Sequence, residues 1–182
     1  MRADLALVEA GLARSRSHAA TLIDAKRALV NGEAIRKPAQ IIVESSSLTL
    51  LPAVDYVSRA GHKLAEALDQ FGELELVGKY CLDVGASTGG FTEVLLLRGA
   101  SSVVSIDVGH DQMVAELKDN PRVTCIEGFN ARELSPETLS DAGVAKANFV
   151  LVVADLSFIS LTLVLEQILS VAPGADLVLL IK

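Results

Sequence analysis

The sequence predicts an α/β protein, with a small N-terminal α+β unit followed by a larger parallel sheet that helices cover on both faces. After residue 60, short apolar strands alternate with helical segments, an order typical of such a sheet. The run from Phe149 to Val153 is apolar throughout, as expected for a strand buried on both faces. Nearer the N-terminus, Asn31-Gly32 separates two short apolar runs and predicts a β-hairpin.

Composition narrows the class of protein. The chain has 182 residues, and 51% of them are hydrophobic, which excludes intrinsic disorder and allows a substantial core. The longest stretches without a charge have ten residues, too few for the ~20 of a membrane span, and the N-terminus lacks the apolar segment of a signal peptide. Cys81 and Cys125 lie in apolar runs and form no disulfide framework. We therefore expect a cytoplasmic protein.

Charge is distributed unevenly along the chain. The net charge is −7, but residues 1–62 carry +2 and residues 63–182 carry −9. A basic N-terminal unit on an acidic body suggests a polyanionic partner for that unit. A charge of +2 is also compatible with an ordinary solvated surface.

The first 52 residues predict two helices and a small sheet. The predicted elements are a helix over 5–12, a helix from Ser15 or Ser17 to Ile23, the hairpin over 28–35, and strands over 41–43 and 48–51. Residues 53–59 are expected to be a linker. The domain organisation is therefore residues 1–52, a linker at 53–59 and a second domain over 60–182.

The second domain alternates regularly. Helices are predicted over 60–71, 91–98, 111–117, 136–141 and 160–171, and strands over 80–84, 103–107, 123–126, 149–154 and 177–181. Ligands of such sheets bind at the carboxyl ends of the strands. Functional residues are therefore expected directly after the strands of this domain.

A glycine-rich loop follows the first strand of this domain, in the sequence Asp-Val-Gly-Ala-Ser-Thr-Gly-Gly-Phe-Thr over residues 83–92. A nucleotide-hydrolysing P-loop needs lysine where the chain has Phe91, and a dinucleotide loop needs glycine where it has Ser87. The remaining pattern, Asp-x-Gly-x-x-x-Gly, is the loop that surrounds S-adenosylmethionine in the common methyltransferase fold. Asp107 ends the next strand and could accept both ribose hydroxyls of that cofactor. A tight turn with a buried acid is the alternative interpretation.

The acceptor of the methyl group is indicated by the residues after the fourth strand. Asp155 follows it, and the prolines of the Asn/Asp-Pro-Pro motif of base-amine methyltransferases are absent. An aspartate with nearby lysines favours a hydroxyl acceptor that must lose a proton, with Lys63 or Lys182 as the base. Each lysine could equally be a solvated surface residue. The histidines show no ligand spacing, so no metal site is predicted.

These motifs resemble the TlyA, or haemolysin A-like, family of ribosomal RNA ribose 2′-O-methyltransferases over essentially the whole chain. The N-terminal motifs resemble an S-four-type RNA-binding domain. They are Arg2-Ala3-Asp4, residues 11–16, and Val30-Asn31-Gly32 with Lys37-Pro38. The motifs of the second domain resemble an FtsJ-like methyltransferase domain with a Rossmann-like sheet. They lie at residues 58–64, 83–92, 154–161 and 179–182.

The resemblance implies roles for individual residues. The family's Lys-Asp-Lys catalytic residues correspond to Lys63, Asp155 and Lys182. The expected contacts to S-adenosylmethionine are Asp83, Gly85, Ser87, Thr88, Gly89, Phe91, Asp107, Asn130 and Asp155. The expected RNA contacts are Arg2, Arg14, Arg16, Lys26, Arg27, Lys37 and Arg59. The implied partners are ribosomal RNA and ribosomal subunits, with no membrane and no metal.

The chain also departs from the family pattern. Lys26 and Ala60 stand where the family usually has glycine, and the chain ends at the fifth strand of a seven-stranded fold, before the family's last catalytic glutamate. We therefore expect a fragment of a longer chain that is not fully active alone. The alternatives are a non-catalytic RNA-binding or ribosome assembly factor and a membrane-active haemolysin, which the absence of an apolar span disfavours.

Overall fold

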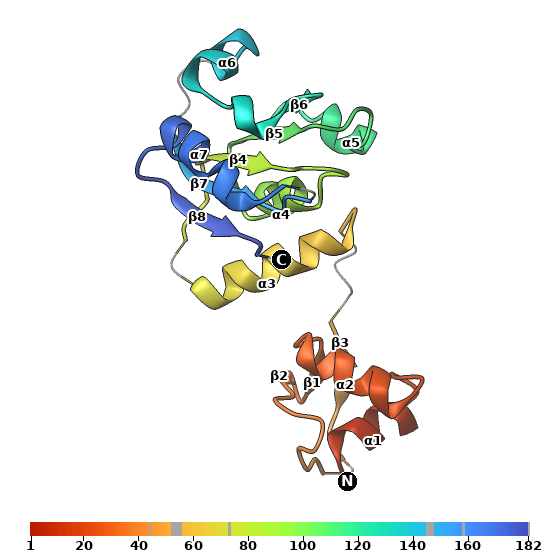
Figure 1. The fold of residues 1–182 in the computed structure, drawn as a ribbon. Coiled ribbons are helices and arrows are strands. Elements are labelled where there is room, and N and C mark those ends of the chain that lie inside the picture. The colour runs from red at the N-terminus through yellow and green to blue at the C-terminus, as the bar shows by residue number, and fades with distance from the viewer. Residues whose placement is uncertain (44, 52–55, 73, 145–147, 158, 182) are drawn as a thin grey trace. The chain divides into compact units, whose positions relative to one another are not determined.

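The computed structural model describes residues 1–43, 45–51, 56–72, 74–144, 148–157 and 159–181. The chain forms two compact units, residues 1–54 and 55–182 (Figure 1). Of the predicted linker at 53–59, residues 53–55 lie outside the described residues, and Arg59 is the first residue of a helix.

The N-terminal unit packs two short helices against a three-stranded antiparallel sheet. Its elements are α1 (Ala3–Glu9), α2 (Arg16–Asp24), β1 (Ala28–Val30), β2 (Glu33–Ala34) and β3 (Leu48–Leu50), with strand order β2-β1-β3. Leu7, Ile23 and Ile35 are buried at its centre. The side chain of Ser15 accepts a hydrogen bond from the amide of His18 at 3.1 Å and caps α2, one of the two predicted starts of this helix.

The predicted hairpin is confirmed. Leu29 pairs with Ala34 and Val30 with Glu33, and the turn residues Asn31 and Gly32 have φ of 52° and 85°. Two successive positive φ values are the signature of a turn whose twist matches the flanking strands.

The second unit contains a five-stranded parallel sheet. Its strands are β4 (Tyr80–Val84), β5 (Ser102–Asp107), β6 (Val123–Glu127), β7 (Phe149–Ala154) and β8 (Asp176–Leu179), in the order β6-β5-β4-β7-β8. β4 lies in the middle, with β5 on one side and β7 on the other. The strand order changes direction between β4 and its two neighbours, since the chain adds β5 and β6 on one side and β7 and β8 on the other. A change of this kind leaves a crevice at the carboxyl ends of the strands.

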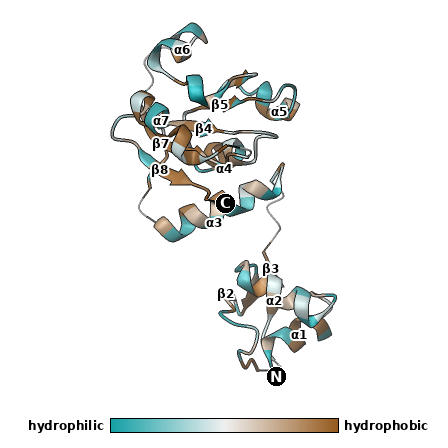
Figure 2. Ribbon diagram, viewed as in Figure 1, coloured by the Kyte–Doolittle hydropathy of each residue, from teal (hydrophilic) through white to brown (hydrophobic). Residues whose placement is uncertain are grey.

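Helices cover both faces of this sheet, as predicted. The helices are α3 (Arg59–Phe71), α4 (Gly90–Leu97), α5 (Ala115–Lys118), α6 (Pro136–Asp141) and α7 (Leu165–Val171), with 3₁₀ turns η1 (Ala131–Glu133) and η2 (Leu161–Leu163). Successive residues of β4 face opposite sides of the sheet. Cys81 packs in one core with residues of α3 and α4, and Leu82 packs in the other core with residues of α6 and α7. Figure 2 shows the resulting pattern, with β8 coloured as hydrophobic and α6 as largely hydrophilic.

Several predicted elements are wrong in type or extent, and the first helix runs over Ala3–Glu9 instead of 5–12. Residues 41–43 do not form a strand, because only Ile41 makes an isolated bridge, to Arg2, and Ile42 alone turns inward. The helix predicted over 111–117 is limited to α5. The helix predicted over 160–171 is divided into η2 and α7 at Val164, whose φ of −129° leaves the helical region although its side chain is fully buried.

Candidate functional site

The glycine-rich loop lies at the carboxyl end of β4 and turns into α4. Gly85 has a φ of 87°, and a Cβ atom built there would lie 3.0 Å from the carbonyl oxygen of Asp155. The loop is tied to the neighbouring strand, because the amides of Gly85 and Ala86 both donate to the carbonyl of Ile106, at 2.8 and 3.1 Å. Gly89, with a φ of 98°, is the N-cap of α4. Glycine is needed at these points because other residues rarely adopt this backbone conformation.

Asp107 braces the same loop from β5. Its Oδ2 accepts a hydrogen bond from the amide of Ser87 at 2.8 Å, and its Oδ1 accepts one from the amide of Gly109 at 2.7 Å. Each carboxylate oxygen has two lone pairs, so both retain the capacity to accept a hydroxyl from a ligand. Asp107 can therefore still accept hydrogen bonds from a ligand in the second cavity, which it lines.

Helix α3 carries Lys63 over the loop. Gly61 allows α3 to approach α4, since a Cβ atom there would lie 2.7 Å from the Tyr56 side chain and 3.1 Å from the carbonyl oxygen of Gly90. Leu64 and Leu68 are buried on the face that packs against the sheet. This packing leaves the exposed side chains of Arg59 and Lys63, one helical turn apart, on the face toward the loop.

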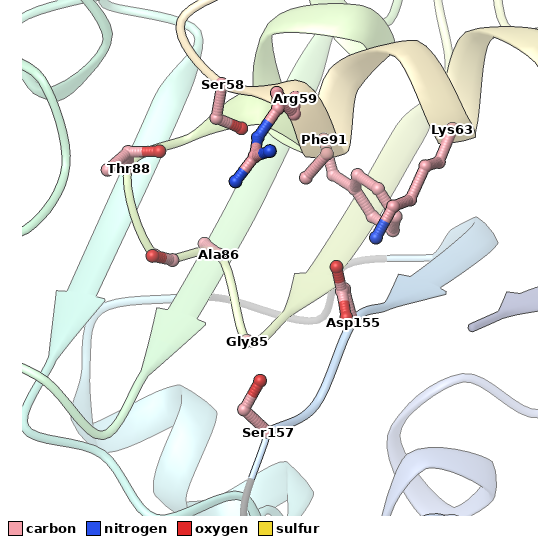
Figure 3. Close-up of a pocket in the computed structure, with 11 residues that line it drawn as sticks. Ser58, Arg59, Lys63, Gly85, Ala86, Thr88, Phe91, Asp155 and Ser157 are labelled. Atoms are coloured by element: carbon pink, nitrogen blue, oxygen red, sulfur yellow. The ribbon is translucent and has the colours of Figure 1, made fainter. Parts of the chain in front are cut away.

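A cavity of about 570 Å³ lies between the start of α3, the glycine-rich loop after β4 and the residues that follow β7. Figure 3 shows the Lys63 Nζ atom and the Asp155 carboxylate pointing toward one another across it, and the Arg59 guanidinium lying above the loop. The full lining consists of Ser58, Arg59, Ala60, Lys63, Gly85, Ala86, Ser87, Thr88, Phe91, Asp155 and Ser157. The structure thus brings together two of the three predicted catalytic residues, whereas Lys182 lies outside the described residues.

A second cavity, of about 450 Å³, adjoins the first through Gly85, Ser87, Asp155 and Ser157. Phe129, Asn130 and Asp107 line it. The side-chain oxygen of Asn130 accepts a hydrogen bond from the amide of Arg132 at 3.1 Å, which leaves its amide nitrogen for a ligand. Seven of the nine predicted cofactor residues, all but Asp83 and Gly89, are therefore divided between two adjoining cavities.

Two predicted cofactor residues, Asp83 and Gly89, are buried and line neither cavity, and Asp83 is completely inaccessible to solvent. The hydroxyl of Thr92 donates to its Oδ2 at 2.7 Å and also lies 2.7 Å from the hydroxyl of Ser105. Burial raises the pKa of Asp83 to about 7, and the hydrogen bond from Thr92 opposes that rise. Its hydrogen bond is therefore made inside the unit, below the glycine loop.

Several cavity residues were not among the sequence predictions. Ser58 and Ser157 flank predicted residues, and their motifs were recognised without a role for the serines. Gln112 lines the second cavity and accepts a hydrogen bond from the Ser87 hydroxyl at 3.1 Å. Its backbone amide donates to Glu127 at 2.9 Å, and the side-chain hydrogen bond from Lys118 to Glu127 lowers the pKa of that carboxyl to about 2. No motif marks Gln112, because β6 positions it from a distance in sequence.

The cationic residues of the N-terminal unit fall into two groups. Arg2 and Arg16 both bind the buried carboxylate of Asp4, at 3.0 and 2.9 Å, and the Arg2 hydrogen bond holds the pKa of that carboxyl well below its usual range. Arg27 donates to the carbonyl of Leu51. Arg14, Lys26 and Lys37 are exposed, and no side-chain hydrogen bond or ion pair holds them within the described residues. Arg59, the remaining predicted RNA contact, belongs to the other unit.

Within the described parts of the chain, no helix is both long and apolar enough to cross a membrane. Over the same residues, no group of three or more histidine, cysteine, aspartate or glutamate side chains could hold a metal ion.

Comparisons with known proteins agree with this architecture. An S4 domain model matches residues 1–46, and an FtsJ-like methyltransferase model matches residues 56–182. The 16S/23S rRNA (cytidine-2′-O)-methyltransferase TlyA of Mycobacterium tuberculosis is 46% identical over 184 residues, covering 100% of this chain and 66% of that protein. Hemolysin A of Brachyspira hyodysenteriae is 41% identical over 162 residues, covering 89% and 65%. The chain therefore spans 66% and 65% of the length of these relatives.

Solved structures give the same result. A protein from Streptococcus thermophilus named as a hemolysin superimposes with a TM-score of 0.65 at 34% identity, covering 100% of this chain and 66% of that one. A protein of the same name from Lactococcus lactis has a TM-score of 0.59 at 40% identity, covering 66% and 55%. By its two domain models and its full-length similarity, the chain belongs to the TlyA, or haemolysin A-like, family, in which an S4 domain precedes an FtsJ-like methyltransferase domain.

Proposed function

We propose that this protein transfers the methyl group of S-adenosylmethionine to a ribose 2′-hydroxyl of ribosomal RNA. The observation that carries the proposal is the placement of Lys63 and Asp155 on opposite sides of one cavity, beside the glycine loop (Figure 3). The relative from Mycobacterium tuberculosis is named for this reaction on cytidine. The cytoplasm, where ribosomes are made, is the expected location.

The residues present fit S-adenosylmethionine. Asp107 is held by two backbone amides in a position to receive the cofactor's ribose hydroxyls. At Gly85 the backbone approaches Asp155 too closely to admit a side chain, so the loop presents bare backbone to the ligand. The apolar ring of Phe129 and the free amide nitrogen of Asn130 suit an adenine base. Bound here, the cofactor would supply an electrophilic methyl group on a sulfonium.

The protein's own groups would then align and deprotonate the acceptor. Lys63 and Asp155 can hold one hydroxyl between them and fix the direction of its oxygen, and alignment of this kind is the main requirement of an in-line methyl transfer. In the role of general base, the Lys63 amine takes the hydroxyl proton as the oxygen–carbon bond forms and the sulfur–carbon bond breaks. By family resemblance, Lys182 shares this task.

The N-terminal unit is proposed to bind the RNA. Its exposed cations Arg14, Lys26 and Lys37 can neutralise phosphates, and RNA binding of this type follows backbone shape and charge. Aromatic residues make up only 4% of the chain, which leaves few platforms for stacking of single-stranded bases. The expected substrate is therefore structured RNA in a ribosomal subunit.

The test uses the full-length chain, purified ribosomal subunits and S-adenosylmethionine labelled in the methyl group. A 2′-O-methyl group blocks alkaline cleavage of the adjacent phosphodiester, so ribose methylation appears as label in alkali-resistant dinucleotides. We expect such label with the parent protein and with Lys79→Ala, which alters an exposed lysine away from both cavities. Lys63→Ala and Asp155→Ala should reduce the rate by about 10²–10⁴-fold, as expected for loss of general acid–base catalysis.

Three results would contradict the proposal. Label in alkali-sensitive mononucleotides would indicate methylation of a base. Lys63→Ala or Asp155→Ala as active as the parent would remove these residues from the mechanism. Unlabelled RNA from a protein that binds both RNA and cofactor would favour the non-catalytic assembly factor.

A further inference from the structure

Asp83 has an oxygen atom that the fold leaves without a partner. Its Oδ2 is engaged by Thr92, but its Oδ1 is buried and has no hydrogen-bond partner among the described residues. Thr92 and Ser105, which complete the network, are themselves almost entirely inaccessible to solvent. A carboxylate in this position would keep a desolvated and unpaired negative oxygen, which is costly.

The charges around Asp83 increase that cost. Asp107 at the end of β5 and Asp155 after β7 both raise the pKa of Asp83 by repulsion, in addition to the larger effect of burial. From α4, the hydroxyl and the backbone of Thr92 both lower the pKa of Asp83 and so oppose the rise, while the acid in the first turn of that helix, Glu93, accepts a hydrogen bond from the amide of Val57 instead. β4, β5 and α4 contain no positive residue, and the cations of α3, Arg59 and Lys63, line the first cavity, where Lys63 faces Asp155.

A ligand could supply the missing positive charge. Asp83 lies two residues before Gly85, which lines both cavities, and Asp107 and Asp155 line the same space. S-adenosylmethionine carries a sulfonium, whereas the product of methyl transfer, S-adenosylhomocysteine, has a neutral sulfur and is otherwise charged alike. Asp107 and Asp155 therefore line the space for a ligand whose charge decreases by one during the reaction, and Asp83 lies buried behind the glycine loop of that space.

We propose that Asp83 is a specificity-determining residue of the cofactor site, which holds a proton in the ligand-free protein and releases it to solvent when the sulfonium binds. The inference rests on the proposed function, because it takes S-adenosylmethionine as the ligand. Coupling of this kind is reciprocal: a cation that expels the proton binds more tightly when the proton is already absent. The ionised residue would then favour the cofactor over its neutral-sulfur product and assist product release.

Isothermal titration calorimetry in buffers of different ionisation enthalpy measures the protons released on binding. We expect about 0.4 proton released per S-adenosylmethionine at pH 7, and fewer for S-adenosylhomocysteine, if the bound cation lowers the proton affinity of Asp83 by about tenfold. The same coupling predicts that the Kd of S-adenosylmethionine is about fivefold lower at pH 8 than at pH 6. Asp83→Asn should abolish the difference in proton release between the two ligands and narrow the difference in their affinities.

The control is Asp176→Asn, which changes an exposed acid at the amino-terminal end of β8, the sheet edge away from the site. It should behave as the parent. Equal proton release for the two ligands, or a difference that persists in Asp83→Asn, would overturn the inference. If Asp83→Asn does not fold, the comparison of the two ligands on the parent protein decides. Binding without proton release would refute the role of Asp83 alone, whereas absence of cofactor binding would refute the proposed function and this inference together.

Discussion

The carboxylate of Asp107 and the amide of Ser87 form a 2.8 Å hydrogen bond that fastens the glycine loop to the neighbouring strand. Ser87 has a φ of 47°, a conformation uncommon for a residue with a side chain, and this hydrogen bond helps to hold it there. Asp107→Asn would turn one acceptor oxygen into a donor that faces a backbone N–H. We expect the affinity for S-adenosylmethionine to fall at least tenfold, measured by calorimetry.

The matched control for Asp107→Asn is Asp119→Asn, which changes the C-cap residue of α5, outside both cavities. It should leave the affinity unchanged. Unaltered binding by Asp107→Asn would mean that the loop keeps its shape without this contact and that the cofactor does not use the carboxylate.

Gly61 provides a second prediction, because the close approach of α3 to α4 depends on it. A methyl group added there must displace the Tyr56 side chain or the Gly90 carbonyl. Gly61→Ala should lower the free energy of unfolding of the methyltransferase unit by about 1–3 kcal/mol, typical of an overpacked contact. Since Lys63 lies on the same helix, methyl transfer should weaken more than cofactor binding.

Urea unfolding followed by NMR signals of residues in β4 and β7 measures the stability, and the labelled-cofactor assay measures transfer. Glu66→Ala, an exposed change on the same helix, serves as the control and should be close to neutral. If Gly61→Ala matches the parent in both measurements, the contact between the two helices has more room than the structure shows.

Local patterns predicted much of this fold and less of its site. The hairpin at Asn31-Gly32 and the strand at 149–154 are determined by residues that are adjacent in the sequence, so the local pattern was sufficient to predict both elements. Ile41 to Val43 looked like a strand because all three are β-branched, but their placement depends on Met1 and Arg2, which lie about 40 positions away. The motif likewise did not indicate that Asp83, a predicted cofactor contact, is completely buried, because burial by β4 is a property of the assembled sheet.

Lys26 gives a prediction about stability rather than activity. It follows the last turn of α2 with a φ of 54°, and its amide donates to Ile23 while that of Arg27 donates to Leu22, the pattern of a helix end that favours glycine. Lys26→Gly should raise the free energy of unfolding of the N-terminal unit by about 1 kcal/mol, because the left-handed conformation is strained for lysine. Lys37→Gly, at a position without a positive φ, should not stabilise the unit.

The stability of Lys26→Gly can be measured by urea unfolding of the full chain, with NMR signals of the N-terminal unit as the probe. The same variant separates stability from RNA binding. If the ammonium of Lys26 contacts phosphate, the slope of log affinity against log salt should decrease by about 0.7–0.9 while stability increases. A destabilised variant would show that the side chain of Lys26 makes a contact that outweighs its backbone strain.

Asp4 makes the stability of the N-terminal unit depend on pH. Its carboxylate is buried between Arg2 and Arg16, and these partners lower its pKa below the value near 3.9 of an unfolded chain. The ionised form is therefore favoured by folding, so the stabilisation is present above about pH 4 and is lost as the pH falls through the lower, folded-state pKa. Asp4→Asn should be less stable than the parent at pH 7, and the difference should shrink below pH 4. Glu9→Gln, which alters an exposed acid of the same helix, should follow the parent. A constant difference between Asp4→Asn and the parent from pH 7 to pH 2 would show that the two arginines bind Asp4 without stabilising its charge.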